Sequence, residues 1–345
     1  MENSFFIFTD KTNPTEIERF HICAWEFRKS SLIEFGFEVS NDSLKLLPNN
    51  FSISLYIPWF NKKCDTKDLY EKLSIAENSR FIFNDSISET KFLDDGRNKN
   101  GVIHVFDGDR KTLCILPITK FIKDEKIVTI NLDLKAYKNH ISANKSNIYF
   151  RFWIKPTVPF ISMRKKGISK TTVIYDVKVN EKRNAPMDSL MKDVDFCKIK
   201  STFLLTIIPN NYDLTFFETE HLRKIRGLEY NSFKTYLNDN RIKENEHLVV
   251  VCKKDNMDSY SFFSIFTEER IGIGQFSLAI LINIVCGILL FIPSYRKTFT
   301  PEIPLTQIWN HLPLEIFVAF LIILLTLIYF TWPSIVHLLK RIFNK

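Results

Sequence analysis

The chain has 345 residues, with 47 Lys and Arg against 39 Asp and Glu, so its net charge is +8, and 45% of its residues are hydrophobic. This balance excludes a disordered or collagen-like chain. With only 9 glycines, the chain is poorly suited to a fold built on several phosphate-binding glycine loops. Hydrophobic residues are unevenly spread: two long apolar runs lie after residue 270, and none lies before it.

The first part of the chain predicts mainly β-strands. Apolar and polar residues alternate with period two in the segments 51–57, 127–134, 147–155 and 173–179. Such alternation indicates sheets with one buried face, and many runs of this kind favour a β-sandwich. Further strands are predicted at 80–84, 101–106, 202–208, 247–254 and 259–266.

Helices are predicted at only two places before residue 270. Segment 65–73 has an N-capping Asp65, and segment 219–237 spaces its apolar residues like one helix face, with Gly227 as a weak point. The polar stretch 180–189 contains Pro186 and is the best candidate for an internal boundary. We therefore expect a β-rich domain at 1–183 and a smaller α+β domain at 188–268.

The same region contains no familiar catalytic motif. Patterns for zinc peptidases, Walker loops, serine hydrolases and EF-hands are absent from the sequence. The sharpest enzymatic alternative is nuclease-like, with Asp107 after one strand and the Asp133-Leu-Lys135 triplet after another, as in a carboxylate-held Mg²⁺ site. Solvated turn charges explain these residues more simply. We expect no enzyme activity and no catalytic, cofactor or metal site.

Two basic clusters are candidate anion-binding sites. They are Arg164-Lys165-Lys166 and Arg223-Lys224-Arg226. Either could hold a nucleotide or lipid head groups, although a solvated face is the more common role of such runs. Nucleic acid is not an expected partner.

The cysteines indicate a reducing compartment. All six are widely separated, and no pair has C-x-x-C spacing, so neither a disulfide framework nor a zinc site is expected. They are Cys23, Cys64, Cys114, Cys197, Cys252 and Cys286.

Two membrane-spanning helices are predicted, at 271–295 and 314–339. The stretches 271–295 and 316–339 contain no Lys, Arg, Asp or Glu, and about 20 apolar residues are enough to cross a bilayer. Tyr295 and Trp309 would lie near one membrane interface and Trp332 near the other, as in an aromatic belt. The resulting fold class is a mainly β, sandwich-like head with some α structure, followed by a two-helix transmembrane hairpin.

The distribution of charge predicts the topology. The first 20 residues lack the charged and apolar regions of a signal peptide, so the head is expected to stay in the cytoplasm. Lys340, Arg341 and Lys345 follow the second span and favour a cytoplasmic C-terminus. We therefore expect a multi-pass inner-membrane protein with both termini in the cytoplasm.

A polar residue interrupts the first span. Asn283 lies at its midpoint, and the small residues Ala279 and Gly287 lie one turn to either side. Small residues allow close helix approach, and an amide in hydrocarbon needs a hydrogen-bonding partner. That partner is either a second copy of the helix or the second span, for instance at Thr326.

This layout of a large β-rich cytosolic head followed by a short transmembrane hairpin resembles the membrane effectors of bacterial anti-phage systems. The resemblance implies a homo-oligomer that permeabilises or depolarises the inner membrane once a cytosolic protein or nucleotide triggers the head. The alternative is a membrane-tethered sensor or scaffold whose head binds a protein or nucleotide while the spans act as a passive anchor.

Overall fold

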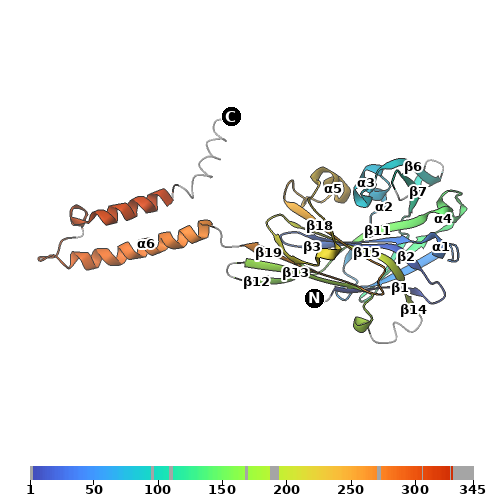
Figure 1. Ribbon diagram of the computed structural model, residues 1–345, viewed down its shortest axis with the longest axis horizontal. Helices are drawn as coiled ribbons and strands as arrows, with labels where there is room; N and C mark the ends of the chain where they lie inside the picture. Colours follow the sequence, from blue (N-terminus) through green and yellow to red (C-terminus); the bar gives the residue numbers. More distant parts are fainter. Residues whose placement is uncertain are drawn as a thin grey trace. The chain divides into compact units, whose positions relative to one another are not determined.

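The computed structural model describes residues 3–94, 97–108, 112–167, 170–186, 194–269, 273–304, 306–326 and 328 (Figure 1). The chain divides into two compact units. The first comprises residues 1–166 and 171–268 and is called the head below; the second comprises 167–170 and 269–345 and contains the apolar helices. Each unit is described by itself.

One layer of the head is a nine-stranded sheet with the order β16-β19-β13-β1-β4-β10-β9; in addition, β12 pairs with β13 and β14 pairs with β1. Strands β1 and β13 are parallel, whereas β4 is antiparallel to both β1 and β10. The strands are β1 (Asn3–Asp10), β4 (Asn50–Tyr56), β9 (Lys120–Lys123), β10 (Ile127–Asp133), β12 (Met163–Lys166), β13 (Lys170–Val179), β14 (Val194–Phe196), β16 (Asp213–Phe217) and β19 (Tyr260–Glu269).

The other layer is a ten-stranded sheet with the order β17-β18-β15-β2-β3-β11-β8-β7-β6, and β5 pairs with β11. Strand β15 runs parallel to β2, and β8 runs parallel to β11. The strands are β2 (Glu16–Glu26), β3 (Ser31–Val39), β5 (Asp65–Asp68), β6 (Ile87–Asp94), β7 (Arg97–Phe106), β8 (Thr112–Ile115), β11 (Asn147–Lys155), β15 (Lys198–Pro209), β17 (Leu222–Gly227) and β18 (His247–Asp255).

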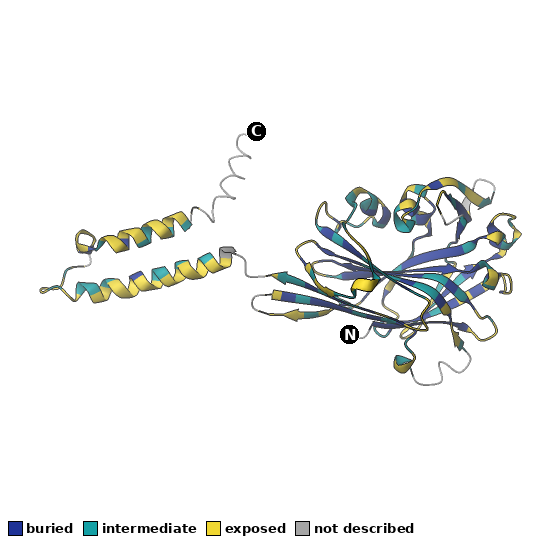
Figure 2. Ribbon diagram, in the orientation of Figure 1, coloured by how far each residue is buried: buried dark blue, intermediate teal, exposed yellow. Residues whose placement is uncertain are grey.

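The main core lies between the two sheets. Phe5 of β1 and Phe35 of β3 meet edge to face with ring centroids 5.3 Å apart, and both side chains are fully buried. Figure 2 shows the strands of both layers as mainly buried. Burying each such ring stabilises the fold by roughly 1.5–3 kcal/mol, so the packed faces of the sheets hold the head together. The predicted sandwich-like, mainly β architecture is confirmed.

A second, smaller core lies on the outer face of the ten-stranded sheet. Helices α2 (Tyr70–Leu73), α3 (Ala76–Phe83) and α5 (Tyr230–Leu237) pack there, on the same side of the sheet (Figure 1). Phe233 of α5 is buried against Trp25 of β2, with ring centroids 5.7 Å apart. The other short helices are α1 (Asn41–Leu44), α4 (Lys135–Asn139) and the 3₁₀ turns at 143–145, 182–184 and 219–221.

Most of the predicted strands are present, and three local predictions are wrong. Segment 80–84 falls in and just after α3 rather than in a strand, and segment 65–73 forms β5 before α2. Segment 219–237 forms a 3₁₀ turn, β17 and then α5 in place of one long helix, and Gly227 ends the strand. In β17 the pairing with β18 outweighs the local helical spacing, because strand formation depends on distant partners.

The predicted division of the head near residues 183–188 does not separate two compact units. Strand β15, which follows that point, pairs with β2 from Lys198–Glu16 to Ile207–Trp25, and β18 and β19 also lie within the two sheets. Residues 1–166 and 171–268 consequently form one unit. A polar, proline-containing connection within a sandwich resembles a domain linker when only its sequence is seen.

Among the described residues of the second unit, one helix is long and apolar enough to cross a membrane, namely Gln275–Arg296 within α6 (Ile273–Arg296). A shorter apolar helix covers Leu314–Thr326. The remainder of the predicted second span, with Trp332 and the basic tail, lies outside the described residues. Ile288 of α6 packs with Ile308, Leu312 and Ile316 in a small apolar cluster.

Candidate functional site

A cavity of about 250 Å³ opens on the outer face of the ten-stranded sheet, and it is called the basic pocket below. Helices α3 and α5, edge strand β17 and the strands beneath them supply its walls. Five of its fifteen lining residues are Arg or Lys, and none is Asp or Glu. The lining comprises Arg19, His21, Cys23, Phe81, Ile82, Phe83, Asn84, Arg151, Phe203, Leu205, Arg223, Lys224, Arg226, Phe233 and Val251.

A β-bulge in edge strand β17 turns its basic residues toward this pocket. Leu222 lies opposite Cys252 of β18, whereas Lys224 lies opposite Val251, so the register shifts by one residue between them. In a regular strand Leu222, Lys224 and Arg226 would share a face. The bulge instead lets Leu222 pack against the main core while Lys224 and Arg226 line the pocket.

Strand β2 has a second bulge with the same effect. Ile17 lies opposite Val39, and Arg19 lies opposite Glu38, with a register shift between them. Ile17 is therefore buried in the main core, and Arg19 lines the basic pocket on the opposite face. Bulges that redirect side chains are common beside functional sites, and here two of them place cations at one cavity.

The basic side chains at the mouth of the pocket are only partly neutralised. Arg226 Nη1 lies 2.6 Å from Glu229 Oε1, and Arg223 Nη2 lies 3.9 Å from Asp255 Oδ2 with more than half of the Arg223 side chain exposed. Lys224 is exposed and has no ion pair within the described part of the chain. Arg19 is paired with Glu38 at 3.7 Å.

The floor of the pocket is a buried hydrogen-bond network. Arg151 donates from Nε and Nη2 to Glu34 Oε2, each at 2.6 Å, and both side chains are almost fully buried. Arg151 also donates to the hydroxyl of Tyr149 at 3.2 Å, and that hydroxyl is 3.0 Å from His21 Nδ1. Tyr236 of α5 donates to Glu34 at 2.9 Å. The network neutralises Arg151 and links α5 to the sheet.

The thiol in the floor is not a nucleophile. Burial raises the pKa of Cys23 well above its usual value, and the nearby Glu34 carboxylate raises it further. The thiol is therefore protonated at neutral pH, whereas cysteine nucleophiles react as thiolates. What the pocket presents is positive charge and aromatic surface.

Arg164, in the first predicted basic cluster, forms an ion pair with a buried carboxylate. Its Nη2 lies 2.7 Å from Oε1 of the fully buried Glu26, and its guanidinium carbon lies 3.5 Å from the centroid of the Phe160 ring. Glu26 also accepts hydrogen bonds from Tyr175 and Ser162, at 2.6 Å and 2.7 Å. Arg164 thus neutralises a buried carboxylate, while Lys165 and Lys166 are exposed on β12; anion binding by this cluster stays a prediction.

The residues of the nuclease-like alternative lie in different sheets. Asp107 follows β7 of the ten-stranded sheet, whereas Asp133 ends β10 of the nine-stranded sheet. Asp133 Oδ1 accepts a hydrogen bond from the backbone N–H of Lys135 at 2.8 Å, as in a turn. Within the described ranges, no group of three or more His, Cys, Asp or Glu is arranged to hold a metal ion.

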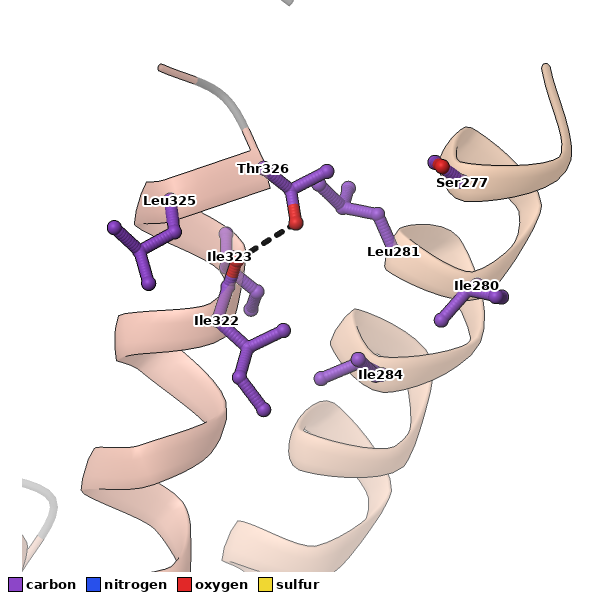
Figure 3. Close-up of a pocket in the computed structure, with 8 residues that line it drawn as sticks. All are labelled: Ser277, Ile280, Leu281, Ile284, Ile322, Ile323, Leu325 and Thr326. Atoms are coloured by element: carbon purple, nitrogen blue, oxygen red, sulfur yellow. Dashed lines mark hydrogen bonds between the residues drawn. The ribbon is translucent and has the colours of Figure 1, made fainter. Parts of the chain in front are cut away.

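In the second unit, α6 and helix 314–326 face each other across an apolar cavity of about 370 Å³ (Figure 3). Leu281 and Ile284 of α6 line it opposite Ile322 and Thr326. The hydroxyl of Thr326 donates to the backbone carbonyl of Ile322 at 2.7 Å, within its own helix.

The predicted polar face of α6 is not the face that lines this cavity. Ala279, Asn283 and Gly287 are all exposed and belong neither to the cavity lining nor to the apolar cluster around Ile288. A Cβ added at Gly287 would meet nothing within 4 Å. Among the described residues the Asn283 side chain has no hydrogen-bond partner, so the predicted alternative, a bond to Thr326, is not formed.

Comparison of the sequence with protein-family models and with curated proteins finds no match.

Proposed function

We propose that this protein is a membrane-anchored effector that depolarises or permeabilises the inner membrane when its cytosolic head is triggered, as in anti-phage defence. The observation that carries the proposal is the open face of α6. A helix of membrane-spanning length exposes Asn283 between the small residues Ala279 and Gly287, on a side that the neighbouring helix leaves uncovered.

A passive anchor has no need of this face. An amide without a partner is costly in hydrocarbon, and small residues one turn to either side let another helix approach closely. If a second copy supplies the partner, interhelical hydrogen bonds contribute roughly 0.5–2 kcal/mol each, and a ring of subunits repeats that gain. Such a ring would present its amides toward a polar path for water and ions.

The proposal includes a two-span topology and an oligomer. The segment 314–339 would form the second span, and both termini would lie in the cytoplasm, because the basic tail follows that span. The trigger would act on the head, which displays the basic pocket as a site for an anionic ligand.

The test is membrane depolarisation in cells that overproduce the protein, followed with a potential-sensitive dye. Asn283→Leu should abolish depolarisation while leaving expression and insertion intact. Asn283→Gln keeps the amide and should retain activity. Ile282→Leu changes an exposed neighbour on the same helix and should match the wild type. Equal depolarisation by the wild type and Asn283→Leu would remove Asn283 from the mechanism.

The second candidate is a membrane-tethered sensor or scaffold. The basic pocket favours it, because a protein whose function is to bind a ligand in its head needs its apolar helices only as a passive anchor. Under this alternative neither the wild type nor any α6 variant would depolarise the membrane, even when the protein is abundant.

A further inference from the structure

The charge of the basic pocket selects an anionic occupant. Its lining includes Arg and Lys side chains from three strands, β2, β11 and β17, and no carboxylate. The acidic partners of these cations, such as Asp255 and Glu229, are not among the residues that line the pocket. In a cavity with partly apolar walls such a charge distribution strengthens attraction for an anion.

Three groups on β17 are available to such an anion. Lys224 has no ion pair within the described ranges, and the pair between Arg223 and Asp255 is long at 3.9 Å. The Nε of Arg226 is buried without a hydrogen-bond partner, although its Nη1 is bound to Glu229. Guanidinium and ammonium groups in this arrangement match the oxygens of a phosphate.

The rest of the pocket is aromatic and aliphatic. Phe81 of α3 and Phe203 of β15 are partly exposed and line the cavity together with Leu205 and Val251. Partly exposed phenyl rings beside a phosphate-binding group are suited to stack on a planar base. The cavity volume of about 250 Å³ is near the lower end of ligand pockets, which restricts the occupant to about one nucleotide unit.

We propose that the basic pocket binds a nucleoside phosphate, with the phosphate against Arg223, Lys224 and Arg226 and the base against Phe81 and Phe203. The binding itself is independent of the function proposed above. Its role as the trigger of depolarisation rests on that proposed function.

The experiment measures binding to the full chain in detergent by isothermal titration calorimetry. The probes are the four 5′-nucleoside monophosphates, the corresponding nucleosides and inorganic phosphate. At least one monophosphate should bind saturably, more tightly than its nucleoside or phosphate alone. Arg223→Gln/Lys224→Gln should weaken binding about tenfold or more, because charge-assisted contacts are lost. Phe203→Leu, which keeps the side chain apolar but removes the ring, should weaken it about tenfold through lost stacking.

The matched control is Lys62→Gln/Lys63→Gln between β4 and β5, which removes the same charge from exposed positions outside the pocket lining and should leave affinity unchanged. Circular dichroism of each variant verifies folding. The proposal is overturned if no monophosphate binds up to millimolar concentration, or if binding survives Arg223→Gln/Lys224→Gln. Phosphate alone binding as tightly as the monophosphates would overturn the aromatic part.

Depolarisation is measured separately, in vesicles containing the protein with and without the bound monophosphate. Binding without depolarisation would leave the pocket assigned and would count against the effector function. Depolarisation without nucleotide binding would count against the pocket assignment and would leave the effector function in place.

Discussion

The buried network below the basic pocket requires a glycine at position 36, where a side chain would not fit. A Cβ placed on Gly36 of β3 would lie 2.0 Å from the hydroxyl of Tyr149, which is bonded to Arg151 and near His21. Any larger residue would displace that hydroxyl and leave the Arg151–Glu34 pair with one partner fewer. Since a hydrogen bond to a charged group contributes about 1.5–3 kcal/mol to stability, this glycine is tied to the integrity of the pocket floor.

His104 is the clearest source of pH-dependent stability in the head. Its side chain is fully buried; Nε2 donates to the backbone carbonyl of Leu73 at 2.8 Å, so Nδ1 accepts from the hydroxyl of Thr90 at 2.9 Å. Both contacts fit a neutral imidazole. Burial lowers the pKa of His104 below its ordinary value of 6.5.

The depressed pKa fixes the sign of the pH effect. Below about pH 6.5 the unfolded chain takes up a proton at this site before the folded one does, so stability is lost as the pH falls. His104→Gln should therefore be destabilised at pH 7.5, and the difference in unfolding free energy from the wild type should narrow toward pH 5. Urea denaturation at a series of pH values measures this, and parallel curves would contradict it.

At the scale of elements, the two helices that wall the basic pocket end in the same way. Asn84 after α3 and Asn238 after α5 both adopt left-handed backbone conformations, each with φ of 52°. Asn238 N–H bonds to the carbonyl of Lys234 at 2.9 Å, and Asn84 N–H bonds to that of Arg80. Asparagine tolerates this conformation better than residues with other Cβ substituents, and glycine tolerates it best.

Replacement at these caps should depend on the backbone requirement. Asn84→Ala and Asn238→Ala should each lower the free energy of unfolding by about 1 kcal/mol, because alanine is strained at positive φ. Asn84→Gly and Asn238→Gly should be close to neutral. Chemical denaturation of the four variants tests the difference, and equal effects of Ala and Gly would show that the side-chain amide, rather than φ, is what matters.

Sequence patterns revealed most strands with one buried face and missed three strands that are buried almost throughout. Strand β3 is buried at every residue, so its sequence carries no alternation, and β1 and β2 are nearly the same. The half-buried face of β10, by contrast, shows in its alternating sequence.

The basic pocket was only half predictable for a related reason. The Arg223-Lys224-Arg226 run is visible in the sequence, but Arg19 and Phe203 reach the same cavity only through the order β17-β18-β15-β2. Long-range strand pairing leaves no local signal. The bulge that directs Lys224 and Arg226 outward is likewise a property of the pairing with β18.

At the scale of the whole molecule, the head forms a single compact unit. Strand β15 lies between β2 and β18, and Tyr260, Phe262 and Phe266 of β19 belong to the main core. A chain ending near residue 183 would expose the edge of β2 and one side of the core. Unpaired edges and uncovered apolar faces favour aggregation.

Truncation tests this unity. A fragment of residues 1–268 should be soluble and unfold in one cooperative transition, whereas residues 1–183 should be insoluble or lack fixed tertiary structure. Near-ultraviolet circular dichroism and denaturant titration of both fragments provide the measurement. A well-dispersed NMR spectrum from 1–183 would restore the two-domain interpretation.

The placement of the cysteines allows the access of water to the open face of α6 to be measured in the native sequence. Of the six cysteines, Cys286 alone is exposed, three residues beyond Asn283 on the same helix, while four are buried and Cys252 is intermediate. A thiol surrounded by lipid chains is shielded from water-soluble maleimides, and one beside an aqueous path is alkylated. Maleimide labelling of Cys286 in the native chain therefore reports whether water reaches this face of α6, as it would in a channel and would not in a passive anchor.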